Sequence, residues 1–139
     1  MNYLIFMLVI AMRFGLNQGY YGCKPNTLEF QNKLNPGSIL KVNCSSNEGV
    51  VENLHELKVN DIYQIPVREF GPGNRIVWRC LLRHGQKVEN FQILWRAYRG
   101  ATLYRCGEIR SWIAKVDGIY LEKNNKTKGF QFYWIVAKQ

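Results

Sequence analysis

Hydrophobic and polar residues alternate along most of the chain in short segments, which are separated by glycine, proline, asparagine and charged residues. An alternation with a period of two is typical of β-strands that bury one face and expose the other. In one segment, Leu40, Val42 and Cys44 share a face that we expect to be buried. Lys41 and Asn43 lie on the opposite face. The alternation therefore predicts an all-β protein rather than a helical one.

The alternating segments follow one another at intervals of roughly ten residues, which is typical of an antiparallel sandwich or barrel. The strand over residues 61–67 is expected at a sheet edge, because Pro66 cannot donate a hydrogen bond to a neighbouring strand. A polar turn over residues 123–129 joins the last two segments as a hairpin. We therefore predict an antiparallel β-sandwich of about eight strands. The segments cover residues 27–34, 39–44, 61–67, 76–82, 91–95, 102–106, 111–115, 118–121 and 130–136.

The amino-terminal segment has a different character. Residues 1–12 are almost entirely apolar. A run of about ten apolar residues is too short to span a bilayer, which needs roughly 20, but it matches the core of a secretory signal peptide. We therefore expect a signal peptide over residues 1–22 and one secreted domain over residues 23–139, with no stable insertion into a membrane. A chain of 139 residues has the length of a single domain.

Four cysteines, Cys23, Cys44, Cys80 and Cys106, lie within the expected mature domain. An even number of cysteines in a small exported domain is typical of disulfides, so we expect two of them. Three pairings are possible, and the sequence does not select one. Strand alternation would point Cys44 and Cys80 into the core. No Cys-x-x-Cys pair is present and neither histidine is spaced as a ligand beside a cysteine, so we expect no metal site and no cofactor.

The chain carries 19 Lys and Arg against 10 Asp and Glu, and the resulting formal charge of +9 favours acidic or anionic partners. Arginines and aromatic residues interleave between residues 95 and 110. On strands, most of these aromatic residues would face inward and the arginines would form a positive outer surface. An acidic segment of a receptor or a cell-wall polyanion suits an exported protein better than a nucleic acid does. The predicted partner contacts are Arg68, Arg75, Lys87, Arg96, Arg99 and Arg105.

Two histidines, His55 and His84, in a basic exported chain also suggest a ribonuclease. General acid–base cleavage would need both imidazoles near one phosphate. Both histidines lie in polar stretches that we interpret as loops, and an exposed loop histidine more often has no catalytic role. We therefore expect no catalytic residues.

Two sequons, Asn43-Cys44-Ser45 and Asn125-Lys126-Thr127, are candidate sites of N-glycosylation in an exported chain. Asn43 should face solvent because it lies on the opposite strand face from Cys44. Asn125 falls at the tip of the predicted hairpin. Early oxidation of Cys44 would compete with addition of a glycan to Asn43.

Several short motifs follow one another in a specific order between about residue 27 and residue 135. They are Asn32-Lys33-Leu34-Asn35-Pro36-Gly37, Leu40-x-Val42-x-Cys44-x-Ser46, His55-x-Leu57, Tyr63, Trp78-x-Cys80, Arg105-Cys106, Trp112-Ile113-Ala114, Asp117-Gly118-Ile119-Tyr120 and a closing Trp134. Together they resemble the plant self-incompatibility S1 family, the S-protein homologues, over nearly the whole expected mature chain.

The resemblance implies a small secreted β-sandwich that is held by disulfides and acts as a protein ligand without catalysis. The founding members of the family are female determinants that pollen recognises, so the resemblance also implies cell–cell signalling through a cell-surface receptor. Trp78, Trp112 and Trp134 would then be structural residues of the core. Two alternatives stay open at this point: a secreted cationic enzyme of the ribonuclease type, and a cationic defence protein that binds membranes or glycans.

Overall fold

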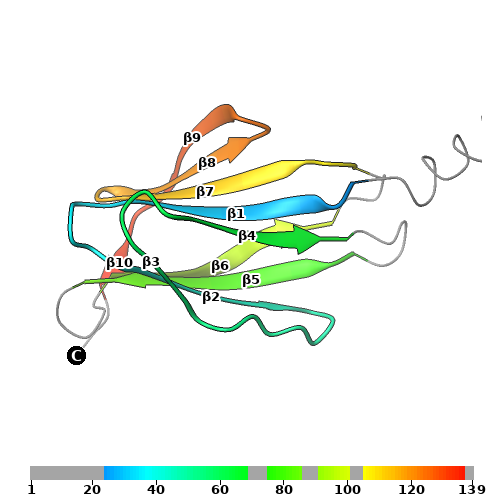
Figure 1. The fold of residues 1–139 in the computed structure, drawn as a ribbon, viewed down its shortest axis with the longest axis horizontal. Coiled ribbons are helices and arrows are strands. Elements are labelled where there is room, and N and C mark those ends of the chain that lie inside the picture. Colours follow the sequence, from blue (N-terminus) through cyan, green and yellow to red (C-terminus); the bar gives the residue numbers. More distant parts are fainter. Residues whose placement is uncertain (1–23, 69–74, 86–90, 101–104, 137–139) are drawn as a thin grey trace, which may run out of the picture.

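The computed structural model describes residues 24–68, 75–85, 91–100 and 105–136, which form two stacked β-sheets (Figure 1). Each sheet has five strands, and we call them sheet A and sheet B. In spatial order, sheet A contains β4 (Ile62–Val67), β1 (Asn26–Lys33), β7 (Ile109–Lys115), β8 (Gly118–Lys123) and β9 (Lys126–Phe132). Sheet B contains β10 (Ile135–Val136), β6 (Phe91–Arg99), β5 (Val77–His84), β2 (Leu40–Ser46) and β3 (His55–Leu57).

The predicted β-sandwich is confirmed, and most strand pairs are antiparallel as expected. The exception is β1, which pairs in parallel with β7 in the middle of sheet A. Strand β4 lies at the edge of sheet A, which confirms the position expected from Pro66. Alternation cannot reveal the direction of pairing, because a strand buries the same face whether its neighbour is parallel or antiparallel.

One strand was missed, and two predicted segments differ from the structure. The short strand β3 was not predicted, because three residues are too few to show alternation. The predicted strand over residues 130–136 is interrupted: β9 ends at Phe132 in sheet A, and β10 begins at Ile135 in sheet B. Arg105 and Cys106 do not lie in a strand, so the predicted strand over residues 102–106 is wrong at its end. Residues 102–104 lie outside the described ranges.

The space between the sheets is filled by a continuous hydrophobic core that includes Trp78, Trp95 and Trp112. Trp112 donates from Nε1 to the carbonyl oxygen of Ala97 at 2.9 Å, which satisfies its polar group and ties sheet A to sheet B. Trp134 packs against the same core and remains partly exposed. Large aromatic side chains supply much of the buried area that stabilises a domain of this size.

The disulfide Cys44–Cys80 joins β2 to β5 within the core, where both side chains are buried as predicted. The two residues face each other in the strand register, with their Cα atoms 4.1 Å apart. A cross-link between positions 36 residues apart contributes about 2–4 kcal/mol, mostly by restricting the unfolded chain. Cys106 is also disulfide-bonded, whereas Cys23 lies outside the described residues.

A buried asparagine in β1 connects the two sheets. Asn32 donates from Nδ2 to the carbonyl oxygen of Leu57 at 2.8 Å and to that of Ser38 at 3.1 Å, and it accepts from the backbone N–H of Leu34 at 2.9 Å. Because these bonds satisfy a buried amide, replacing it would leave backbone groups without partners. The asparagine therefore fixes the β1–β2 turn beneath one end of the sandwich.

The predicted hairpin between β8 and β9 is confirmed, but the predicted turn over residues 123–129 is too long: Asn124 and Asn125 are the two turn residues, and β9 begins at Lys126. Their φ angles are 52° and 64°, which suits a tight hairpin turn in which asparagine tolerates positive φ. The glycosylation of Asn125 stays a prediction. No helix among the described residues is long and apolar enough to cross a membrane.

Candidate functional site

The outer face of sheet B carries arginines from two neighbouring strands. Alternation along β5 points Arg79 and Leu81 away from the core, and alternation along β6 does the same for Leu94 and Arg96. The register places Arg79 opposite Arg96 and Leu81 opposite Leu94. Arg99 follows at the exposed end of β6. We call the surface formed by these five residues the cationic face.

The charges of the cationic face are not balanced within the part of the chain that the structure describes. No carboxylate there lies within 4.0 Å of Arg79 or Arg96. The acidic side chain found on this side of sheet B is that of Glu56, which lies 3.8 Å from the ammonium of Lys41. Like charges that face each other across two strands destabilise a sheet. The pair of arginines therefore costs some stability and offers two guanidinium groups to an external acidic group.

An apolar pair lies beside the arginine pair on the cationic face. Leu94 is 67% exposed, which is unusual for a leucine in the middle of a strand, and its cross-strand neighbour Leu81 is partly exposed. Apolar side chains bordered by arginines are typical of the centre of protein–protein interfaces, where Arg is enriched and Lys is depleted. The composition of the face therefore suits a protein partner better than a free ion.

Arg105, a predicted partner contact, has a different environment from Arg96 and Arg99. Its guanidinium lies 2.8 Å from the carboxylate of Glu108, donates to the carbonyl oxygen of Arg99 at 2.9 Å, and sits 5.5 Å from the centre of the Tyr98 ring. These contacts hold the chain that leads into β7 against the end of β6. These contacts give Arg105 a structural role, so we do not include it in the cationic face.

The other predicted contacts are not residues of the cationic face or lie outside the described residues. Arg68 and Arg75 are exposed on either side of residues 69–74, which the structure does not describe, and Lys87 is also not described. The carbonyl oxygen of Arg75 accepts from Asn47 at 3.0 Å, and the same side chain accepts from the N–H of Val77 at 2.9 Å. Asn47 therefore anchors the loop after β2 to the start of β5.

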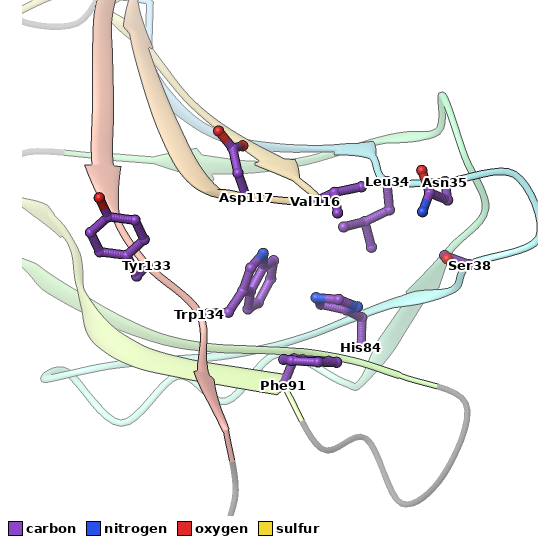
Figure 2. Close-up of a pocket in the computed structure, with 9 residues that line it drawn as sticks. All are labelled: Leu34, Asn35, Ser38, His84, Phe91, Val116, Asp117, Tyr133 and Trp134. Carbon is purple, nitrogen blue, oxygen red and sulfur yellow. The ribbon is translucent and has the colours of Figure 1, made fainter.

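A second candidate site is a cavity of about 380 Å³ at one end of the sandwich. It lies where five segments meet: the β1–β2 turn, the end of β5, the start of β6, the β7–β8 turn and the crossing from β9 to β10. Figure 2 shows the rings of Trp134 and His84 at its centre, with Tyr133 and Asp117 on one side and Leu34 on the other. The cavity brings together residues that are distant in the sequence.

The aromatic residues of the cavity support one another. The ring of His84 stacks on Phe91 with 5.0 Å between centroids and meets the edge of Trp134 at 4.2 Å. Trp134 donates from Nε1 to the carbonyl oxygen of Lys115 at 2.7 Å, which fixes the indole. Burial lowers the pKa of His84 below its ordinary value of 6.5, so its imidazole is neutral at pH 7. Its Nε2 atom is buried without a hydrogen-bond partner among the described residues.

The two histidines lie in strands β3 and β5, so the prediction that they occupy loops is wrong. They are also held apart. His55 stacks on Tyr63 with 3.8 Å between ring centroids, whereas His84 packs in the cavity. In the strand register, Val42 of β2 lies opposite His55 of β3 on one side and opposite Leu82 of β5 on the other. The Cα atoms of His55 and His84 are therefore two strand spacings and two residues apart, roughly 12 Å. The structure therefore does not bring them to one phosphate.

The sequence missed Arg79 and the cavity for related reasons. Arg79 falls on the exposed side of a predicted strand, but its pairing with Arg96 depends on strand order and register, which alternation does not give. The sequence did indicate that Arg79 faces outward, because its neighbours Trp78 and Cys80 are both apolar. The lining residues of the cavity come from five separate segments, so no local pattern could have indicated it. Within the described ranges, no group of three or more His, Cys, Asp or Glu side chains could hold a metal ion.

Comparison with known proteins gives a consistent result. Residues 27–134 match the family model for plant self-incompatibility protein S1. S-protein homolog 14 of Arabidopsis thaliana is 35% identical over 142 residues, which cover 99% of each chain. S-protein homolog 25 of the same plant is 32% identical over 133 residues, covering 91% of this chain and 92% of the relative.

A solved structure of an SPH (Self-Incompatibility Protein Homologue) protein superposes with a TM-score of 0.64 at 27% identity. The match covers 81% of this chain and 96% of the other. SPH proteins are described as a widespread family of small, highly stable, secreted proteins from plants. The similarity therefore extends from the sequence motifs to the arrangement of the sheets.

Proposed function

This chain belongs to the plant self-incompatibility protein S1 family of secreted plant proteins, and we propose that it is an extracellular ligand that binds an acidic segment of a cell-surface protein through the cationic face. The observation that carries the proposal is the Arg79–Arg96 pair, whose charges have no acidic partner in the described structure. The function we propose is recognition without catalysis.

A rigid sheet suits this role. The cationic face lies on β5 and β6, which are central in sheet B and are linked through β2 to the core disulfide. Its backbone therefore needs little reordering when a partner binds, which lowers the entropic cost of association. Arginines would pair with carboxylates in two-pronged hydrogen bonds, and the long-range attraction would speed the encounter.

The test is binding of the labelled protein to plant protoplasts, which lack a cell wall and so remove wall polyanions from the measurement. The variant Arg79→Glu/Arg96→Glu reverses two charges on the cationic face. Lys58→Glu/Lys128→Glu is the matched control, because it makes the same change in net charge at two exposed lysines outside that face. We expect at least a tenfold loss of binding for the arginine variant, equivalent to about 1.4 kcal/mol, and little change for the control.

Two further results would decide the nature of the partner. Treatment of the protoplasts with protease should abolish binding if the partner is a protein. Binding to anionic liposomes or to polygalacturonate that equals binding to protoplasts would instead favour the alternative of a cationic defence protein. Equal losses in the arginine variant and the lysine control would contradict the proposal, because binding would then depend on net charge alone.

A further inference from the structure

The cavity at the end of the sandwich has chemistry that differs from that of the cationic face. At about 380 Å³ it falls within the range of small-molecule sites, roughly 300–1,000 Å³. Among the described residues that line it, Asp117 is the one acidic residue, and none is a lysine or an arginine. This is notable in a chain with 19 Lys and Arg. Among these described residues an anionic ligand would find no cation to pair with, so their chemistry differs from that of the cationic face.

Several polar side chains at the cavity are free to bind a ligand. The amide of Asn35 and the hydroxyls of Ser38 and Tyr133 make no hydrogen bond within the described structure, and the buried Nε2 of His84 also lacks a partner. Asp117 accepts from the hydroxyl of Tyr120 through Oδ2, which leaves its other oxygen available. Together these groups provide both hydrogen-bond donors and acceptors, so they match a ligand whose groups can both donate and accept hydrogen bonds. Hydroxyl groups have this property.

The aromatic rings of the cavity are held in place by contacts with one another and with the backbone. The Trp134 indole is fixed by its bond to the Lys115 carbonyl and by contact with His84, and Phe91 supports the other side of the imidazole. Leu34 lies across from these rings in Figure 2. Aromatic rings held in this way offer a flat apolar surface to one side of a ligand, while polar groups around the rim reach its edge.

We propose that this cavity binds a short neutral oligosaccharide, with a sugar ring against the aromatic residues and its hydroxyl groups bonded to Asn35, Ser38 and Asp117. A sugar combines an apolar ring face with hydroxyl groups that both donate and accept. An organic amine fits less well, because Asp117 already shares an oxygen with Tyr120, and the ammonium of Lys115 lies 4.3 Å from the centre of the Tyr120 ring. This inference is independent of the partner proposed for the cationic face.

The experiment is a titration of the ¹⁵N-labelled full-length secreted protein, monitored by NMR at the indole N–H of Trp134. The neutral probes are cellotetraose, xylotetraose, β-1,4-galactotetraose and mannotetraose at millimolar concentration. Tetragalacturonate and spermidine are the anionic and cationic probes. We expect at least one neutral tetrasaccharide to shift the Trp134 signal, and neither charged probe to do so.

Variants locate the binding. Asn35→Ala/Ser38→Ala removes two side chains that make no hydrogen bonds with the described residues, so the protein should remain folded, and we expect about a tenfold weaker affinity. Arg79→Glu/Arg96→Glu should bind the sugar as the unmodified protein does, which separates this site from the cationic face. The proposal is overturned if no neutral probe binds, if a charged probe binds instead, or if the double alanine variant binds the sugar with unchanged affinity.

Discussion

Charged side chains on the outer faces of the two sheets differ in how many partners they have within the fold. On sheet A, Glu29 is 8% exposed although it points away from the core, because it is surrounded by donors. Gln64 donates to it at 3.0 Å, Gln31 donates at 3.3 Å, and the hydroxyl of Ser111 donates as well. On sheet B, the cationic face has no comparable set of internal partners among the described residues.

This contrast separates a structural surface from a binding surface. A charge whose hydrogen bonds are satisfied within the fold stabilises the fold, and an external partner gains little by approaching it. A charge that faces a like charge weakens the fold slightly and gains most from an external partner of opposite sign. The net charge of the chain alone would not show which surface is structural and which binds a partner, since both sheets carry basic residues.

The largest effect on stability should come from sheet A. Glu29→Ala removes the common acceptor of Gln64 and Ser111, so we expect a loss of about 1–3 kcal/mol in the free energy of unfolding. Urea denaturation measures this loss. Binding to protoplasts should be unchanged for the fraction that is folded. A loss below about 0.5 kcal/mol would mean that the hydrogen bonds of Glu29 do not stabilise the sheet.

The next effect concerns glycans on the two sheets. Asn43 is exposed on β2 and faces Leu81 in the register, so a glycan there would lie beside the cationic face. We expect a chain glycosylated at Asn43 to bind protoplasts about tenfold more weakly, because the glycan covers the contact surface. Asn125 at the sheet A hairpin is the control site. Separated glycoforms, compared with Asn43→Gln and Asn125→Gln, give the measurement, and equal binding by all of them would contradict the prediction.

A smaller effect should appear when the arginine pair is broken. Arg79→Ser removes the repulsion with Arg96, so we expect the free energy of unfolding to rise by about 0.2–1 kcal/mol at low ionic strength. The gain should shrink as salt screens the charges. Lys58→Ser provides the control for removal of an exposed cation. A decrease in stability for Arg79→Ser alone would show that this arginine, like Glu29, is held by the fold.

The smallest effect concerns pH, and it should leave both outer faces unchanged. Both histidines of the chain lie between the sheets, where His55 contacts Tyr63 and His84 lines the cavity. Because burial lowers the pKa of His84 in the folded state, the unfolded chain binds more protons below pH 6.5. Stability attributable to His84 is therefore present above pH 6.5 and is lost as the pH falls through its folded pKa.

Thermal unfolding of the protein and of His84→Phe at pH 7.5 and pH 5.5 measures this contribution. We expect acidification to lower the stability of the unmodified protein more than that of the variant, in which a ring that does not titrate replaces the imidazole. An equal decrease in both proteins would assign the pH dependence to other groups.

The sequence was sufficient for the fold class and the inward-facing residues, but not for the strand pairing or the surfaces. Alternation around Cys44 and Cys80 predicted two inward-facing cysteines, and Pro66 predicted an edge strand, because each of these properties depends on one strand. The parallel pairing of β1 with β7 could not be predicted, since it depends on contacts across the whole chain. For the same reason the sequence indicated Arg96 as an exposed cation without indicating that Arg79 lies opposite it.

The central claim is that the cationic face contacts a cell-surface protein, and photo-crosslinking from single positions tests it most directly. A benzophenone amino acid at position 94 would lie on the cationic face, where the native Leu94 is 67% exposed. The same amino acid at position 62, where Ile62 is 55% exposed on the outer face of sheet A, is the matched control. We predict that irradiation on intact protoplasts gives a protein adduct from position 94 and none from position 62. An adduct from position 62 without one from position 94 would contradict the assignment of the cationic face as the binding surface.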